Sequence, residues 1–259
     1  MTAPAPPLPA DLTAGLRRLK LASMRRIAPE LLVTAKTQRW SPEEFLRTLV
    51  EAEITSRDAS NARARLKAAN FPVTKHLDEF DVAASSIPRA TFDYLASLEW
   101  IRAAENPVLV GPAGTGKSHV LVALGHAAVD AGHRVRYFSA AELVDTLYRG
   151  LADNSVGRVI ETILRADVVI LDELGFAPLD ANGAQLLFRF VAAAYERRSL
   201  GIASHWPFEE WGRFLPETTT AGSMLDRLLH HAHVVVTQGD SFRMREARSR
   251  GGHPQPPKP

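Results

Sequence analysis

The sequence contains no cysteine, and this absence excludes several classes of site together. Disulfide bridges, thiolate zinc sites, iron–sulfur clusters and cysteine nucleophiles all need the missing thiol. A chain without cysteine also fits the reducing cytoplasm, where we expect the protein. Long apolar runs are missing as well. No stretch approaches about 18 consecutive apolar residues, so we expect no membrane-spanning helix.

A large excess of charge of one sign is also missing. Lys and Arg number 31 while Asp and Glu number 29, which gives a net charge of +2. This near balance gives no argument for nucleic acid, and the position of the basic residues matters more than their sum. The apolar fraction of 46% and the charged fraction of 23% are typical of a globular protein. A wholly disordered or collagen-like chain is therefore excluded.

The start of the chain is rich in proline and predicts a disordered leader over residues 1–10. A helix is disfavoured there by Pro4, Pro6, Pro7 and Pro9. From Asp11 the pattern becomes helical, because apolar residues recur at roughly helical spacing with basic residues between them.

A clear helix start follows at Ser41. Ser41 can cap the helix, Pro42 suits its first position, and Glu44 completes a capping box. The Asn-Phe-Pro sequence at residues 70–72 is expected to end this helix. We therefore expect a small helical N-terminal domain over residues 11–72 that binds DNA or a partner.

The later turns of this domain are strongly basic. They carry Arg57, Arg63, Arg65 and Lys67. Such a run is often only a solvated helix face. Further basic residues lie at 17–26, so contact with DNA phosphates remains an open alternative. The four residues named above are our candidates for this contact.

The rest of the chain alternates short apolar strands with helical segments, which predicts an α/β fold with a parallel sheet. The expected strands are Pro107–Val110, Arg134–Phe138, Asp167–Leu171, Leu200–Ser204 and His233–Thr237. The expected helices are Thr91–Ala104 and segments near 117–130, 140–150, 182–197 and 222–231. We expect this α/β domain to cover residues 73–243, with a flexible basic tail at 244–259.

A complete P-loop pattern follows the first expected strand. It consists of Gly111, Pro112, Ala113, Gly114, Thr115, Gly116, Lys117 and Ser118. Glycines let backbone N–H groups turn toward phosphates, and the N-terminus of the following helix adds positive potential. Lys117 is expected to reach the β- and γ-phosphates of ATP, and the Ser118 hydroxyl to ligate Mg²⁺.

Two carboxylates end a buried strand 54 residues after Ser118. In this Walker B pattern Asp172 would hold Mg²⁺ and Glu173 would polarise the attacking water. A second carboxylate here favours hydrolysis over transfer to an acceptor. Alone, the Asp-Glu pair could equally cap a helix, but the P-loop favours the catalytic interpretation.

Three further residues are candidates for contact with nucleotide. His205 follows the next strand and could sense the γ-phosphate through a ring N–H, or be a solvated loop histidine. Arg227 could be an arginine finger toward a neighbouring subunit, or pair locally with Asp226 or Glu217. Arg243 is a weaker candidate for a second phosphate sensor.

The histidines at 230, 231 and 233 resemble a metal cluster. We do not expect a metal there, because neighbours on one helix turn do not converge.

The sequence as a whole resembles a known family, the IstB-like ATP-binding proteins encoded beside the transposase in bacterial insertion sequences. The resemblance covers residues 12–245 and is carried by segments at 19–24, 41–46, 53–57, 70–72, 77–81, 111–119, 171–175, 207–211, 225–228 and 239–243. The P-loop is generic, whereas Ser41-Pro42-Glu43-Glu44-Phe45-Leu46 and Pro207-Phe208-Glu209-Glu210-Trp211 are specific to the family.

The resemblance implies an AAA+ ATPase close to the helicase loader DnaC, with ATP and Mg²⁺ as cofactors. The resemblance also implies that His119 belongs to the segment that binds ATP, residues 111–119. Such proteins assemble on duplex DNA with ATP, bend it, and recruit and stimulate a transposase. The family usually has Asn at position 205 and Thr at position 118. The short tail after Thr237 implies the absence of a full lid domain, as in the family.

Other functions remain open alternatives. A helicase loader would share the fold but act on a protein and single-stranded DNA. A small-molecule kinase is disfavoured by Glu173. A nucleotide-dependent assembly module with negligible turnover would bind ATP without consuming it.

Overall fold

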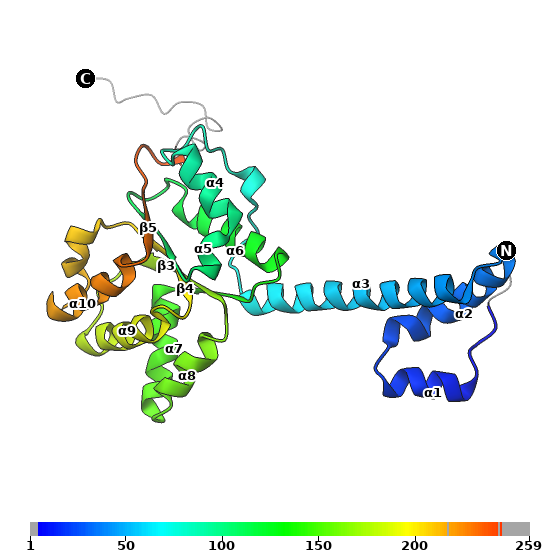
Figure 1. Cartoon of the computed structure of the whole chain (residues 1–259). Helices are drawn as coiled ribbons and strands as arrows, with labels where there is room; N and C mark the ends of the chain where they lie inside the picture. The colour runs from blue at the N-terminus through cyan, green and yellow to red at the C-terminus, as the bar shows by residue number, and fades with distance from the viewer. Residues whose placement is uncertain (1–4, 217, 243, 245–259) are drawn as a thin grey trace, which may run out of the picture. The chain divides into compact units, whose positions relative to one another are not determined.

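A computed structural model of the chain describes residues 5–216, 218–242 and 244 (Figure 1). Side chains of residues 218–221 lie outside that description. The chain divides into two compact units, Met1–Ala64 and Arg65–Pro259. In the described part of the chain, no helix is long and apolar enough to span a membrane.

The N-terminal unit is helical. It contains α1 (Ala10–Arg18), α2 (Ala22–Gln38) and most of α3 (Pro42–Ala69). The capping box is confirmed: the Glu44 N–H donates to Ser41 Oγ over 3.1 Å, and the Ser41 N–H donates to the Glu44 carboxylate over 3.4 Å.

From the sequence we expected the N-terminal domain to end at residue 72, beyond the end of α3. In the structure the two units divide inside α3, between Ala64 and Arg65. The last turn of the helix belongs to the larger unit, because Ala69 is fully buried in one of its apolar clusters. Residues 1–4 of the expected leader and 245–259 of the expected tail lie outside the described residues.

A buried carboxylate organises the N-terminal unit. Glu53 on α3 is 6% exposed and accepts hydrogen bonds from the backbone N–H groups of Ser23 at 2.8 Å and Met24 at 3.1 Å. It thereby satisfies donors at the start of α2. Arg57 donates to Glu53 over 2.9 Å and also to the Lys20 carbonyl over 2.9 Å. The hydrogen bond from Arg57, helped by those from α2, lowers the pKa of Glu53.

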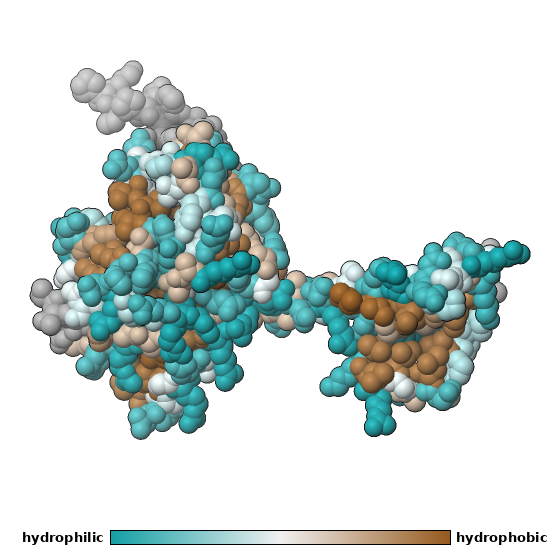
Figure 2. All heavy atoms as spheres, in the orientation of Figure 1, coloured by the Kyte–Doolittle hydropathy of each residue, from teal (hydrophilic) through white to brown (hydrophobic). Residues whose placement is uncertain are grey.

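Part of the apolar face of α3 remains open to solvent. Leu46, Val50 and Ile54 are spaced one helical turn apart and are 60%, 38% and 52% exposed. Figure 2 shows apolar surface gathered over the N-terminal helices. The helical pattern of the sequence therefore contains more apolar surface than this unit buries by itself.

The larger unit is built on a five-stranded parallel sheet, as the sequence predicted. Its strands are β1 (Asn106–Val110), β2 (Val135–Ser139), β3 (Val168–Leu174), β4 (Ser199–Ser204) and β5 (Ala232–Val236). Their order is β2-β3-β4-β1-β5, so β1 lies between β4 and β5. Every residue of β1 is buried, as expected for a strand covered on both faces.

Helices cover both faces of the sheet (Figure 1). Val108 and Val110 point into one apolar cluster and Leu109 into the other, because side chains alternate along a strand. The first cluster includes residues of α7 (Ala140–Ala152), α8 (Val156–Ile163), α9 (Ala181–Ala194) and α10 (Thr218–Leu229). The second includes residues of α4 (Arg89–Ser97), α5 (Glu99–Arg102) and α6 (Lys117–Asp130).

Several helix predictions were wrong in detail. The expected helix Thr91–Ala104 is divided at Leu98, whose φ of 61° ends α4 before α5 begins. The helix expected near 182–197 ends at Ala194, and the one expected near 222–231 ends at Leu229. Helix α8 was not predicted, and neither were the short 3₁₀ helices η1 (Leu77–Glu79) and η2 (Phe208–Arg213).

Candidate functional site

The P-loop joins the end of β1 to the start of α6. Gly111 has a φ of 138° and Gly116 a φ of 95°, so both adopt a backbone that favours glycine. At Gly111 a Cβ would lie 2.1 Å from the Thr237 carbonyl oxygen, which leaves no room for a side chain. The glycines of the motif therefore allow a tight loop in close contact with the segment after β5.

Neighbouring strands brace this loop. The Gly111 N–H donates to the Ser204 carbonyl at the end of β4 over 3.1 Å. The hydroxyls of Thr115 and Thr237 are 2.7 Å apart, and the Phe242 N–H donates to the Gly114 carbonyl over 3.0 Å. Pro112 and Ala113 form the exposed tip of the loop.

Lys117 is buried at the base of the loop. Its ammonium donates to the carbonyls of Gly111 and Pro112, both over 2.6 Å. The side chain is 8% exposed, which is rare for lysine. A lysine at the N-terminus of a helix, behind a glycine-rich loop, is suited to bind phosphate.

Asp172 connects the P-loop to the Walker B strand. Its carboxylate is 3% exposed, and Oδ1 accepts from the Ser118 hydroxyl over 3.0 Å. The same oxygen accepts from the Glu173 N–H over 2.8 Å. The structure thus brings Lys117, Ser118 and Asp172 together in one site, from β3 and from the start of α6.

Tyr137 on β2 was not identified from the sequence. Its hydroxyl donates to Asp172 Oδ2 over 3.0 Å, so both oxygens of the carboxylate have partners. Burial raises the pKa of Tyr137 strongly, and the Asp172 charge and hydrogen bond raise it further. No signal in the sequence indicated this contact, because it depends on the pairing of β2 with β3, which places Ser139 opposite Asp172.

Glu173 has an unusual backbone. Its φ is 58°, and the pairing of β3 with β4 shifts register between Leu171 and Leu174. A left-handed conformation at a residue other than glycine costs about 1–3 kcal/mol and is concentrated at functional sites. Its side chain is exposed, whereas Asp172 and Leu174 beside it are buried. The irregularity therefore turns this carboxylate out of the sheet, as bulges near active sites do.

His205 lies just after β4, near the P-loop lysine. Burial lowers its pKa, and the charge of Lys117 lowers it further. Its ring centroid is 4.7 Å from that of Trp206 and 6.4 Å from that of Phe176, a ring on the loop after β3. Both effects favour the neutral imidazole, whose ring N–H can donate.

His119, in the first turn of α6, lies beneath the P-loop. Its ring meets the ring of Phe80 edge-on, with centroids 5.4 Å apart. Burial lowers the pKa of His119, and Lys75 lowers it further. Phe80 also lies within 2.7 Å of where a Gly116 Cβ would be, so the segment after η1 borders the site.

Arg227 contacts residues of α9 and of its own helix, α10. It lies on α10, its guanidinium carbon is 5.1 Å from the ring centroid of Phe188 on α9, and it donates to the Ser223 carbonyl over 2.9 Å. Arg243 lies outside the described residues.

The basic candidates on α3 differ in their surroundings. Arg57 is held by Glu53 and the Lys20 carbonyl, as described above. Arg63 donates to the Ala59 carbonyl over 3.2 Å, and Lys67 is exposed. Arg65 is half-buried.

The donor set fits ATP with Mg²⁺. Glycines with no room for a Cβ and a buried ammonium suit phosphate, and the Ser118 hydroxyl beside the Asp172 carboxylate offers the oxygen ligands that Mg²⁺ prefers.

The chain matches the family described as IstB-like ATP binding protein over residues 14–250. It belongs to that family. A similar relative is the ATP-binding protein of insertion sequence IS21 from Pseudomonas aeruginosa. The two are 35% identical over 242 residues, which are 93% of this chain and 91% of the relative.

Solved structures show the fold of this IstB-like protein. AMPPCP-bound DnaA from Aquifex aeolicus superposes with a TM-score of 0.53 at 21% identity, over 68% of this chain and 54% of DnaA. The DnaC helicase loader superposes with a TM-score of 0.52 at 18% identity, over 63% of this chain and 96% of the loader. The fold predicted from the sequence, a parallel sheet flanked by helices with a P-loop after its first strand, is confirmed.

Proposed function

We propose that this IstB-like protein is an AAA+ ATPase that regulates transposition. It assembles on duplex DNA with ATP and Mg²⁺, remodels the DNA, and recruits and stimulates a partner transposase. Hydrolysis of ATP then resets the complex. The proposal of ATP hydrolysis rests on Glu173. This residue has an exposed carboxylate and a strained backbone, and it directly follows Asp172, which is hydrogen-bonded to Ser118. The insertion-sequence relatives support the link to transposition.

Three residues would bind the nucleotide and its ion. Lys117 would exchange its bonds to the loop carbonyls for bonds to the β- and γ-phosphates. The Ser118 hydroxyl and the Asp172 carboxylate would hold Mg²⁺, which neutralises phosphate charge when bound. Because Ser118 and Asp172 already lie 3.0 Å apart, little rearrangement of these side chains is needed.

Two residues would act on the reacting phosphate. Glu173 would accept the proton of the attacking water, since its carboxylate is exposed beside Asp172. His205 would donate a hydrogen bond to the γ-phosphate, which a neutral imidazole can do through either ring nitrogen. Burial and the charge of Lys117 both lower the pKa of His205, which favours the neutral ring.

Arg227 would act between subunits. We place it as the arginine that reaches the nucleotide of a neighbouring copy in a ring or spiral. Its contacts inside one chain, a ring face and a helix carbonyl, are weak enough to be exchanged for phosphate. Closure of that interface would require bound ATP, and hydrolysis would open it.

The helical N-terminal domain, residues 11–72, would contact DNA and partners, and residues 73–243 would form the ATPase domain. Arg63, Arg65 and Lys67 are the phosphate contacts that we favour, because Arg57 is already engaged inside its own unit. The exposed apolar residues of α3 offer a surface on which a second copy or the transposase can bury area.

The test measures the mass of the Glu173→Gln protein by light scattering. The variant should form a large complex only when ATP–Mg²⁺ and a duplex of several helical turns are both present. Glu209→Gln, at an exposed glutamate of η2, is the matched control and should hydrolyse ATP normally.

Each alternative function predicts its own outcome, either in this experiment or in an assay of ATP hydrolysis. Assembly on single-stranded DNA alone would favour a helicase loader. Normal turnover by Glu173→Gln would remove Glu173 as the base. Turnover that requires a metabolite and ignores DNA would favour a small-molecule kinase. If the wild-type protein assembles with ATP but consumes none in a single-turnover assay, it is an assembly module.

A further inference from the structure

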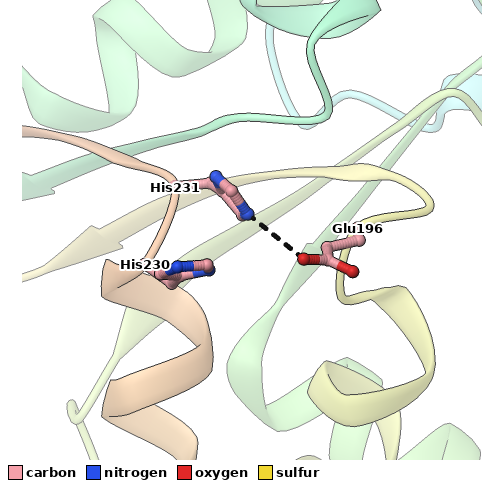
Figure 3. A group of neighbouring side chains, drawn as sticks. All are labelled: Glu196, His230 and His231. Atoms are coloured by element: carbon pink, nitrogen blue, oxygen red, sulfur yellow. Dashed lines mark hydrogen bonds and ion pairs between the residues drawn. The ribbon is translucent and has the colours of Figure 1, made fainter.

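Two helix-to-strand turns at the edge of the sheet opposite the P-loop bring three metal-binding side chains together. Glu196 lies in the turn between α9 and β4, and His230 and His231 lie in the turn between α10 and β5. One ligand atom from each of the three residues lies within 4.8 Å of the others. Figure 3 shows these side chains facing one another from the two turns.

From the sequence we expected no metal here, because two histidines on one helical turn do not converge. In the structure, however, the two histidines are not on one helical turn. Helix α10 ends at Leu229, and β5 begins at Ala232, so His231 lies in the turn that leaves the helix. The two imidazole centroids are 4.2 Å apart, with 58° between the rings. The end of the helix therefore lets adjacent histidines converge.

Neighbouring groups orient the ligands. The Tyr195 hydroxyl lies 2.7 Å from His230 Nδ1, and an ion bound through Nε2 would keep this hydrogen bond. Such a bond to the second ring nitrogen is the usual support of a histidine ligand. His231 Nε2 lies 3.5 Å from a carboxylate oxygen of Glu196, close to the spacing of two ligands on one ion. Tetrahedral ligands at about 2.1 Å from an ion stand about 3.4 Å apart.

We propose that Glu196, His230 and His231 form a binding site for a divalent transition-metal ion, with Zn²⁺ as the best fit. Two imidazoles and one carboxylate are a ligand set typical of zinc and leave a fourth position for water. Nitrogen ligands disfavour Mg²⁺, so the site differs in chemistry from the Ser118–Asp172 pair. All three side chains are at least partly exposed, so an ion can enter from solvent.

A bound ion would join the turn after α9 to the turn after α10. Helix α10 also carries Arg227, one turn before His230. The ion would therefore hold in place the end of the helix that bears the proposed finger. The site itself does not depend on the proposed function, because its ligands are all on this chain.

The test is a competition titration of tag-free full-length protein with Zn²⁺ against a chromophoric chelator, without nucleotide. The wild-type protein should take up about one equivalent of Zn²⁺. His231→Ala and Glu196→Gln should each lower the affinity at least about 10-fold, the smallest loss typical of disturbing a metal site. At the same Zn²⁺ concentration, the Tm of the wild type should rise more than that of either variant.

Two controls separate this site from others. His233→Ala should bind Zn²⁺ as the wild type does, since His233 is held by Glu105 over 2.6 Å. Asp172→Asn should also keep Zn²⁺ binding. If Asp172→Asn no longer binds the one equivalent of Zn²⁺, the ion lies in the nucleotide site, and the proposal is overturned. Equal binding by the wild type and His231→Ala, or no stoichiometric binding at all, would also overturn it.

A second measurement needs no variant. Co²⁺ bound to the wild-type protein should give the strong visible absorption of a four-coordinate ion, and Zn²⁺ should displace it. A weak spectrum typical of a six-coordinate ion would contradict the ligand set.

Discussion

The hydroxyl of Tyr137 donates a 3.0 Å hydrogen bond to the buried carboxylate of Asp172. Because Ser118 and the Glu173 amide hold the other oxygen, the carboxylate has one fixed orientation. The pKa of Tyr137 is raised by burial and by Asp172, so the hydroxyl keeps its proton and remains a donor. Tyr137 is thus a positioning residue for the proposed Mg²⁺ ligand.

Tyr137→Phe should lower ATP turnover about 10-fold, since leaving a buried carboxylate oxygen without its donor costs about 1–3 kcal/mol. The variant should also need more Mg²⁺ to reach half its maximal rate, because a less constrained Asp172 binds the ion more weakly. Steady-state hydrolysis measured over a series of Mg²⁺ concentrations checks both effects.

Tyr148→Phe is the matched control, because the Tyr148 hydroxyl also bonds an aspartate, Asp180 at the start of α9. It should leave the Mg²⁺ dependence unchanged. An unchanged Mg²⁺ dependence in Tyr137→Phe as well would show that Tyr137 has only a packing role.

Lys117→Ala should weaken ATP binding by about 10- to 100-fold, the size of a lost hydrogen bond to a charged group. Titration with a fluorescent ATP analogue measures the loss. Lys36→Ala, at an exposed lysine of α2, should bind ATP as the wild type does. Thermal unfolding must accompany the titration because Lys117 also bonds two carbonyls of its own loop. Wild-type affinity in a folded Lys117→Ala protein would exclude the P-loop as the nucleotide site.

The unfolding free energy should fall as the pH drops below about 6.5, the ordinary pKa of histidine. Burial lowers the pKa of His119, His126 and His205 in the folded protein. Between the folded and the ordinary pKa the unfolded chain binds more protons, so stability rises with pH through this window and is lost on acidification. Carboxylates with lowered pKa, such as Glu53, act at lower pH.

Urea unfolding between pH 7.5 and 5.5 measures this slope. His126→Gln should flatten it, because His126 is 6% exposed and its Nε2 has no hydrogen-bond partner among the described residues. His133→Gln, in the turn after α6, is the control. A slope that is the same in His126→Gln and wild type would show that His126 does not contribute.

Replacing Arg63, Arg65 and Lys67 together with Ala should weaken duplex binding and flatten its salt dependence. Each phosphate contact contributes about 0.9 to the slope of log K against log salt, so the slope should shrink by up to about 3. Arg89→Ala, at an exposed arginine paired with Asp93, serves as the control. If the triple variant keeps the wild-type slope, these residues are not phosphate contacts.

Sequence reasoning placed Gly111–Ser118 and Asp172 in one site, and the structure brings them together, because both follow directly after apolar strands, where a parallel sheet gathers its loops. It missed Tyr137, since a tyrosine in a strand has no pattern that distinguishes a core ring from a hydrogen-bond donor. It missed the backbone strain at Glu173 because register shifts depend on the neighbouring strand. It misjudged the ends of α4 and α10, because Leu98 and Leu229 fit a continuing helix by local preference alone.

The bracing of the P-loop has a consequence for synthesis. Thr115 and Thr237 share a hydrogen bond although 122 residues separate them in the chain. On the ribosome the loop emerges long before β4, β5 and the segment that carries Phe242, which supply its contacts. A message cut short before β5 therefore encodes both nucleotide motifs and yet yields a product whose loop lacks its support. The P-loop therefore depends on the last part of the fold, and a late frameshift would remove its contacts while leaving both nucleotide motifs intact.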